Sequence, residues 1–215
     1  MRRAGETPPF LRFVNLCGAC INFINDNRPA CAERTARVEN MATVYTIGYE
    51  GTDIDRFIAT LKAVGVTTLA DVRAVPVSRK KGFSKTRLRD RLEQEGIAYV
   101  HFVELGDPKA GRDAARAGKM DEFYRVYTKH LERNEAKGAL SVLAETALND
   151  SVCLLCFERD PAHCHRTMIA IRLKQRGLDV FDLFGDEPAR YVRHVAKLPR
   201  RNTRQSDAES QPEIR

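Results

Sequence analysis

The sequence predicts a single α/β domain: a mainly parallel sheet of about five strands with helices on both faces, in a Rossmann-like three-layer arrangement. From residue 43 onward, strand-like and helix-like segments alternate, the pattern of parallel strands joined by helical crossovers. Residues 152–157 form an almost continuous apolar run, as expected of a strand covered on both faces. With 215 residues, 43% of them hydrophobic, the chain is large enough to bury one such core.

The first half of the domain carries clear helix boundaries between its strands. Asp53 is expected to cap a helix that Gly65 ends, and Ser84 to cap a second helix that Gly96 ends. Each of these helices has apolar residues at helical spacing between its boundary residues. The five expected strands cover residues 44–47, 66–72, 97–103, 152–157 and 180–184.

The second half is expected to hold four more helices. Two lie in the connection before residue 152, where apolar side chains recur at helical spacing over 123–131 and 140–147. A third carries Met168, Ile169 and Leu173 on its inner side and ends near Gly177. The last begins at Pro188, a favourable residue for the first helical turn.

Three segments are expected along the chain. Residues 1–40 lack a clean period and are expected to be a poorly structured extension, produced by a start codon placed too early or present as a genuine flexible arm. Residues 41–198 form the α/β domain. Residues 199–215 are polar and charged without a period, so disorder is expected there.

Composition and charge indicate which binding partners and which cellular compartment to expect. The net charge of +7 favours anionic small molecules or nucleic acid, although a solvated basic surface has the same charge. No apolar run reaches the ~20 residues that a membrane helix needs, so no membrane is expected.

The six cysteines do not resemble a disulfide framework, which indicates reduced thiols and a cytoplasmic location. Neither a dinucleotide fingerprint nor a phosphate-binding loop is present, and no cofactor is expected. The oligomeric state is left open.

The loops that follow parallel strands meet at one edge of a sheet, where ligands usually bind. In this chain those loops collect acids, bases, a hydroxyl and a thiol, and we expect a functional site there. General acid–base chemistry needs ionisable groups near the reacting centre, and guanidinium groups hold anions by paired hydrogen bonds. The candidate catalytic residues are Glu50, His101, Glu158, Cys164 and His165. The candidate substrate-binding residues are Tyr49, Arg73, Ser78, Arg79, Lys85 and Arg166.

The cysteines near the fourth strand allow two interpretations. Cys164 lies at an expected helix start, where the helix dipole and nearby Arg166 would stabilise a nucleophilic thiolate. Alternatively it only caps a turn, and Cys156 is a small buried hydrophobe. Zinc could also be bound by Cys153, Cys156, Cys164 and His165. Cys153 and Cys156 should point to opposite faces of their strand, however, and no metal site is expected.

The segment 79–91 is strongly basic. It has a single acid and could follow a phosphate backbone, with Phe83 available to stack on a base. Its charges could equally be the solvated side of a helix.

Nine motifs or single residues occur in order along the chain: Thr46-Ile47-Gly48-Tyr49-Glu50-Gly51, Asp71-Val72-Arg73, Pro76, Ser78-Arg79, Gly82-Phe83-Ser84, His101, Leu105-Gly106, Cys156-Phe157-Glu158 and Cys164-His165-Arg166. Together they resemble one known family, the bacterial and archaeal domain of unknown function 488 (DUF488). The resemblance runs from about Thr43 to Phe184 and implies an α/β domain with its site at the same edge of the sheet. It implies no activity, and Cys153 and the amino-terminal cysteines match none of its motifs.

Two functions are therefore expected as alternatives. The first is an enzyme acting on a nucleotide, nucleic acid or other phosphate-bearing substrate. In it, Arg73, Arg79 and Arg166 would hold the anion and Cys164 would be the nucleophile. The second is a non-catalytic module that binds nucleic acid through residues 79–91.

Overall fold

A computed structural model of the chain describes residues 42–192. The expected extension at residues 1–40 and the expected tail at residues 199–215 lie outside the described residues. Five strands form one sheet in the order β3-β2-β4-β1-β5, and every neighbouring pair is parallel. The strands are β1 (Thr43–Gly48), β2 (Thr68–Asp71), β3 (Ala98–His101), β4 (Val152–Cys156) and β5 (Asp179–Phe184).

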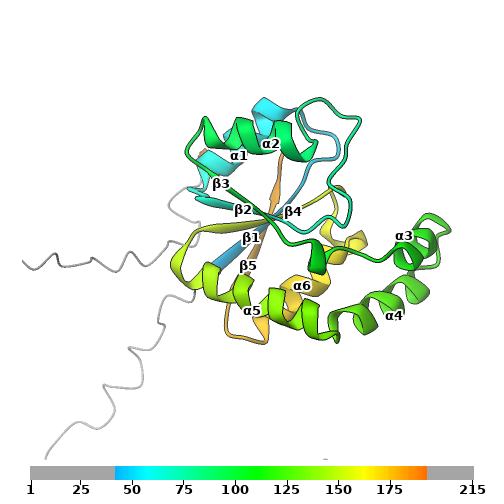
Figure 1. Cartoon of the computed structure of the whole chain (residues 1–215). Helices are drawn as coiled ribbons and strands as arrows, with labels where there is room; N and C mark the ends of the chain where they lie inside the picture. The colour runs from blue at the N-terminus through cyan, green and yellow to red at the C-terminus, as the bar shows by residue number, and fades with distance from the viewer. Residues whose placement is uncertain (1–41, 193–215) are drawn as a thin grey trace, which may run out of the picture. The chain divides into compact units, whose positions relative to one another are not determined.

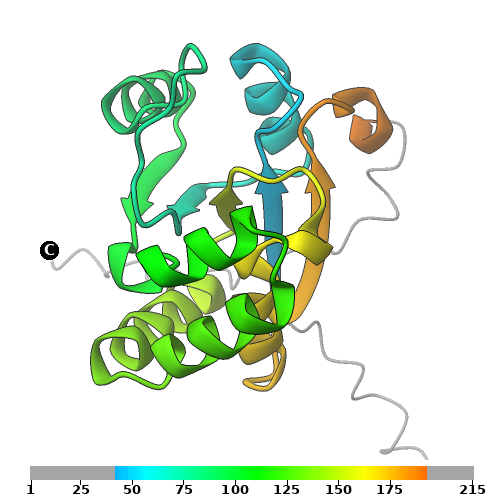
Figure 2. The same cartoon turned by 90° about the vertical axis from the view of Figure 1, so that its right-hand side faces the viewer.

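Helices cover both faces of this sheet, as the sequence predicts (Figures 1 and 2). In Figure 1, α1 and α2 lie above the sheet and α5 and α6 lie below it. The helices are α1 (Ile54–Ala63), α2 (Lys85–Glu93), α3 (Lys109–Arg116), α4 (Met120–Leu131), α5 (Asn134–Asn149), α6 (His165–Lys174) and α7 (Pro188–Val192). Two short 3-10 turns are also present, η1 (Val103–Leu105) and η2 (Pro161–His163).

The two hydrophobic clusters of the domain follow the alternation of side chains along the strands. Val152 and Leu154 of β4 pack on the side of α4, α5 and α6. Cys153 and Leu155 of the same strand pack on the side of α1 and α2. Successive strand residues point to opposite faces, so β4 supplies both clusters and is buried throughout.

The expected helix boundaries at the start of the domain are confirmed. The Asp53 carboxylate accepts a hydrogen bond from the Arg56 backbone N–H at 2.8 Å and caps α1. Gly65, with φ of +71°, follows the end of that helix in the left-handed conformation that glycine tolerates. Ser84 occupies the N-cap position of α2, although its hydroxyl makes no capping hydrogen bond.

The expected strands at 66–72 and 97–103 are longer than the observed β2 and β3, because their ends turn into loops and into η1. Helix α3 was not expected. Its sequence offers only alanines as apolar side chains, too small to produce a recognisable helical stripe. Among residues 42–192, no helix combines the length and the hydropathy needed to cross a lipid bilayer.

Candidate functional site

An open cavity of about 750 Å³ lies where the strands end. Its lining comes from the loops after β1, β2 and β4, from the first turn of α6, and from the segment that includes α3. The volume lies within the range of roughly 300–1,000 Å³ that is typical of small-molecule sites. The lining residues are Tyr49, Arg73, Ala74, Val75, Val77, Ser78, Arg79, Lys80, Asp107, Lys109, Arg112, Ala115, Arg116, Cys156, Phe157, Glu158 and His165.

The strand order explains why a cavity forms here. β1 and β4 are neighbours, but the chain leaves β1 toward α1 and leaves β4 toward α6, on the opposite face. Such a divergence opens a crevice at the carboxyl ends of a parallel sheet. Gly48 lets the two loops approach closely, because a Cβ at this position would lie 1.8 Å from the Glu158 carbonyl oxygen.

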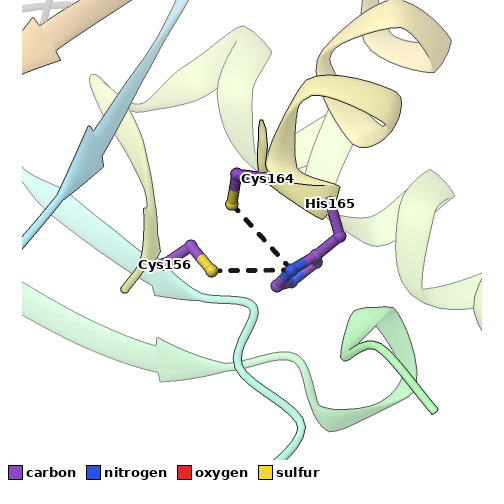
Figure 3. Close-up of side chains that lie close together, drawn as sticks. All are labelled: Cys156, Cys164 and His165. Carbon is purple, nitrogen blue, oxygen red and sulfur yellow. Dashed lines mark hydrogen bonds between the residues drawn. The ribbon is translucent and has the colours of Figure 1, made fainter. Parts of the chain in front are cut away.

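A buried cluster of two thiols and an imidazole adjoins the cavity, and two of its three residues line it (Figure 3). Cys156 ends β4, Cys164 is the N-cap residue of α6, and His165 begins that helix. The His165 Nδ1 lies 3.5 Å from the Cys156 sulfur and 4.0 Å from the Cys164 sulfur. Its Nε2 is 2.8 Å from the Val72 carbonyl oxygen, which fixes the orientation of the ring. The Cys156 thiol also donates to the Glu158 carboxylate at 3.0 Å.

Burial dominates the acid–base properties of this cluster. It raises the pKa of both the Cys156 and the Cys164 thiol. Burial also opposes the charge on His165, but the Cys164 sulfur beside the ring and the hydrogen bond to Val72 raise its pKa to about 9. Burial likewise works against an ionised Glu158, yet the hydrogen bond from Cys156 lowers the pKa of that carboxyl group. At neutral pH, both thiols of the cluster are therefore protonated and the Glu158 carboxyl group is ionised.

The wall of the cavity is basic. Six lining residues are cationic and two are anionic: Arg73, Arg79, Lys80, Lys109, Arg112 and Arg116 against Asp107 and Glu158. Among the described residues, Arg79 and Lys109 have no ion-pair partner. Their charges are consequently available to an anion that enters the cavity.

Arg73 differs from Arg79 and Lys109 because its guanidinium already has a carboxylate partner. Its guanidinium donates to both oxygens of the buried Asp71, at 2.8 and 2.6 Å, and to the Phe83 carbonyl oxygen at 2.9 Å. Burial works against the charge, but the hydrogen bonds to Asp71 raise the pKa of Arg73 above its usual value. The guanidinium also lies over the Tyr49 ring, 5.2 Å from its centroid. Arg73 therefore builds the floor, with much of its hydrogen-bonding capacity in use.

Seven of the candidate residues named from the sequence line the cavity or reach its cluster. They are Tyr49, Arg73, Ser78, Arg79, Glu158, His165 and Cys164, the last of which contacts the cluster without lining the cavity.

The structure places the other four candidates outside the cavity lining, in structural contacts. Glu50 accepts a hydrogen bond from the Arg159 backbone N–H at 3.0 Å. Lys85 and His101 contact each other at 3.2 Å on the edge of the sheet. Arg166 is fully buried and donates to the Thr46 hydroxyl and to the carbonyl oxygens of Glu158 and Arg159. It holds the loop that carries Glu158.

The structure bears on two interpretations of the sequence. Cys164 does begin a helix, but only 1% of its surface is exposed and burial raises the pKa of its thiol, which favours the turn-capping interpretation over a stabilised thiolate. Phe83 is completely buried, stacked on Tyr49 with ring centroids 4.5 Å apart, and it has no exposed face for a base.

Several site residues are absent from the candidates named from the sequence. Cys156 is one of them: the sequence offers it as a buried hydrophobe or as a zinc ligand, and in the structure it lines the cavity and contacts both Glu158 and His165. Strand alternation contained the signal, because the interval of three from Cys153 turns Cys156 to the other face. No such sequence signal indicates the cations of the unexpected α3 segment, which are Lys109, Arg112 and Arg116.

Comparison with known proteins identifies a family. The family model described as "Domain of unknown function DUF488" matches residues 53–173. This agrees with the resemblance seen in the sequence motifs. No curated protein and no solved structure matches the chain significantly.

Proposed function

Since the chain belongs to the DUF488 family, whose name assigns no activity, we propose from the cavity itself that it is an enzyme acting on a phosphate-bearing substrate. One observation carries this proposal. A wall of basic side chains faces a floor that contains Glu158, Cys156 and His165, all within one cavity. The wall provides anion binding and the floor provides groups that can react or transfer protons.

Binding of the anion is assigned to Arg79 and Lys109. Both are exposed, both line the cavity, and neither has an ion-pair partner among the described residues. A guanidinium can hold a phosphate through two parallel hydrogen bonds, whereas an ammonium acts as a point charge. Arg73 contributes its charge at the floor but keeps its hydrogen bonds to Asp71.

The remaining surface of the cavity suits a substrate that also has an apolar part. Phe157 is 45% exposed, and Val75 and Val77 are exposed by 56% and 74%. An aromatic ring beside a basic wall can stack on a nucleobase while the cations hold the phosphate. A nucleotide or the end of a nucleic acid therefore matches this combination of groups.

Proton transfer is assigned to Glu158. Its carboxylate lines the cavity, and the buried Arg166 positions its backbone by donating to its carbonyl oxygen. Glu158 is also the nearest carboxylate to the Cys156 thiol, at 3.0 Å. A positioned carboxylate of this kind contributes roughly 10²- to 10⁴-fold to the rate when it transfers a proton.

The alternative function, nucleic-acid binding by residues 79–91 without chemistry, has less support. Arg91 is paired with Glu95, and Arg89 with Asp90 and Glu93. Lys81, Lys85 and Arg87 remain as exposed cations outside the cavity lining.

The experiment is a binding titration and a turnover screen with nucleotides and other phosphate esters. Arg79→Ala should weaken binding roughly 10- to 150-fold, because a hydrogen bond to a charged group contributes roughly 1.5–3 kcal/mol. Glu158→Gln should lower turnover roughly 10²- to 10⁴-fold while binding persists. The matched control is Arg87→Ala, which removes an exposed cation of α2 outside the cavity and should change neither property.

Three results would contradict the proposal. One is full turnover in Glu158→Gln. Another is an equal loss of binding in Arg79→Ala and Arg87→Ala, which would favour the alternative instead. If no phosphate-bearing compound binds even at low salt, both functions are wrong, because binding by basic residues is strongest there.

A further inference from the structure

The cluster of Cys156, Cys164 and His165 has the spacing of a metal site. The two sulfurs and the His165 Nδ1 all lie within 4.8 Å of one another, and all three residues are buried. The sulfur-to-nitrogen distances are 3.5 and 4.0 Å (Figure 3). In a tetrahedral zinc site with Zn–S near 2.3 Å and Zn–N near 2.0 Å, sulfur and nitrogen ligands are about 3.5 Å apart.

The orientation of the imidazole supports the same interpretation. The His165 Nε2 donates to the Val72 carbonyl oxygen at 2.8 Å, so Nδ1 is the nitrogen that faces the two sulfurs. Metal-binding histidines characteristically donate their other N–H group to a carbonyl or carboxylate oxygen, which fixes the tautomer and the ring. The backbone beyond β2 thus holds the ring with Nδ1 toward both thiols.

Cys153 provides an internal comparison. It lies three residues before Cys156 on the same strand, is fully buried, and packs in the apolar cluster on the other face. It is outside the cluster of possible ligands found among residues 42–192. The arrangement of Cys156 and Cys164 around one imidazole is therefore not the usual packing of a buried cysteine.

We propose that Cys156, Cys164 and His165 bind a zinc ion at the floor of the cavity, with its fourth position open to water or substrate. Two thiolates balance the charge of the divalent ion, and thiolate with imidazole is a ligand set that suits zinc. Cys156 and His165 line the cavity, so the ion is reached from the side of the basic wall. Only the role of the ion toward a substrate, as a Lewis acid beside Glu158, rests on the proposed function.

The test begins with metal analysis of the full chain purified from cells grown with zinc, without added chelators. We expect zinc in stoichiometric amount by elemental analysis. Replacement by Co²⁺ should give the intense visible bands of tetrahedral coordination and the near-ultraviolet charge-transfer band of thiolate ligands. The thiols should react with a disulfide reagent only after a chelator removes the ion.

Variants assign the ligands. Cys156→Ser, Cys164→Ser and His165→Gln should each weaken zinc binding by more than the ~10- to 100-fold expected for loss of an outer partner. Cys153→Ala is the matched control and should keep the ion. A second control replaces Cys17, Cys20 and Cys31 with serine together, so that any metal held by those thiols is removed. Circular dichroism verifies that each variant is folded.

The outcomes separate this proposal from the proposed function. A purified chain that neither contains zinc nor takes up Co²⁺, or one in which Cys156 and Cys164 form a disulfide, overturns the zinc site. Zinc that remains after all three ligand substitutions, or that is lost equally in Cys153→Ala, also overturns it. Turnover that depends on Glu158 without any metal leaves the enzyme standing and removes the zinc. Bound zinc without turnover supports the zinc site and contradicts the proposed enzyme.

Discussion

Asp71 and Arg73 form a buried ion pair at the point where β2 becomes the wall of the cavity. None of the Asp71 side chain and 6% of the Arg73 side chain are exposed. The Tyr99 hydroxyl donates to the same carboxylate at 2.6 Å, so both Asp71 oxygens have partners. Burial and then this hydrogen bond raise the pKa of Tyr99 above its usual value, which keeps the phenol as a donor.

Asp71→Asn should destabilise the domain by roughly 3–5 kcal/mol, because it leaves the buried Arg73 guanidinium without a counter-charge. Urea unfolding measures this as a lower midpoint with an unchanged slope. Arg89→Gln is the control, since it removes a half-exposed cation from surface pairs that contribute at most about 1 kcal/mol. Equal midpoints for the two variants would show that the buried pair does not stabilise the fold.

At the scale of elements, β1 and the loop after β4 fit together only because residue 48 is glycine. A Cβ there would lie 1.8 Å from the backbone oxygen of Glu158 and 3.0 Å from the Arg159 Cα. Backbone atoms cannot move aside as the end of a flexible side chain can. The close approach also brings the Glu50 carboxylate to the Arg159 N–H.

Gly48→Ala should therefore displace the loop that carries Glu158 and lower both stability and substrate binding. We expect a loss of stability of at least ~1–3 kcal/mol, the usual cost of overpacking a buried position. Gly138→Ala is the matched control. Gly138 lies inside α5 with no atom near the added methyl group, and its replacement should stabilise the helix by roughly 0.5–1 kcal/mol. Thermal unfolding of both variants tests the contrast, and a harmless Gly48→Ala would contradict it.

Glu95 connects α1 with α2. Its carboxylate is 2.5 Å from the Lys62 ammonium and is also hydrogen-bonded to Arg91. These hydrogen bonds, from Lys62 first and Arg91 second, lower the pKa of Glu95 from its usual 4.5 to about 2. A lowered pKa in the folded state means that the charged form stabilises the fold above about pH 4.5 and that this contribution is lost as the pH falls toward 2.

Glu95→Gln should thus lower the stability near neutral pH slightly and flatten its decline between pH 4.5 and 2. Urea midpoints across this range, compared with wild type, measure the difference in slope. Glu93→Gln serves as the control, because that carboxylate lies 3.7 Å from Arg89 on the same helix without contact to α1. If the urea midpoints of wild type and Glu95→Gln changed in parallel with pH, the stabilising connection of α1 and α2 by Glu95 would be ruled out.

At the scale of the whole molecule, more of the domain's fold than of its functional site could be predicted from the sequence. The regular alternation of strands and helices was enough to predict a parallel sheet covered on both faces. The sequence motifs were enough to identify the family. Strand order was not predictable, because it depends on which side each crossover takes. That order decides where the chain diverges and hence where the cavity opens.

The candidate residues that do not reach the cavity show why side chains are harder to place than strands. Arg166 follows β4 by position, but the Thr46 hydroxyl of β1 and two carbonyl oxygens of the loop after β4 accept its hydrogen bonds and leave it buried. His101 ends the edge strand β3, where its ring contacts Lys85 and the Arg73 backbone carbonyl oxygen instead of reaching the cavity. Such competition between polar partners is settled only after the chain has folded, and sequence order does not reveal it.

Strand β4 is bonded on both sides, with Cys156 opposite Gly48 of β1 and Leu155 opposite Asp71 of β2. A deletion or insertion of one residue inside this strand would turn Leu155 toward the cavity and bury a thiol beneath α1 instead. Changes in chain length can therefore accumulate in the outer loops, while this central strand must keep its length for the site to keep its chemistry.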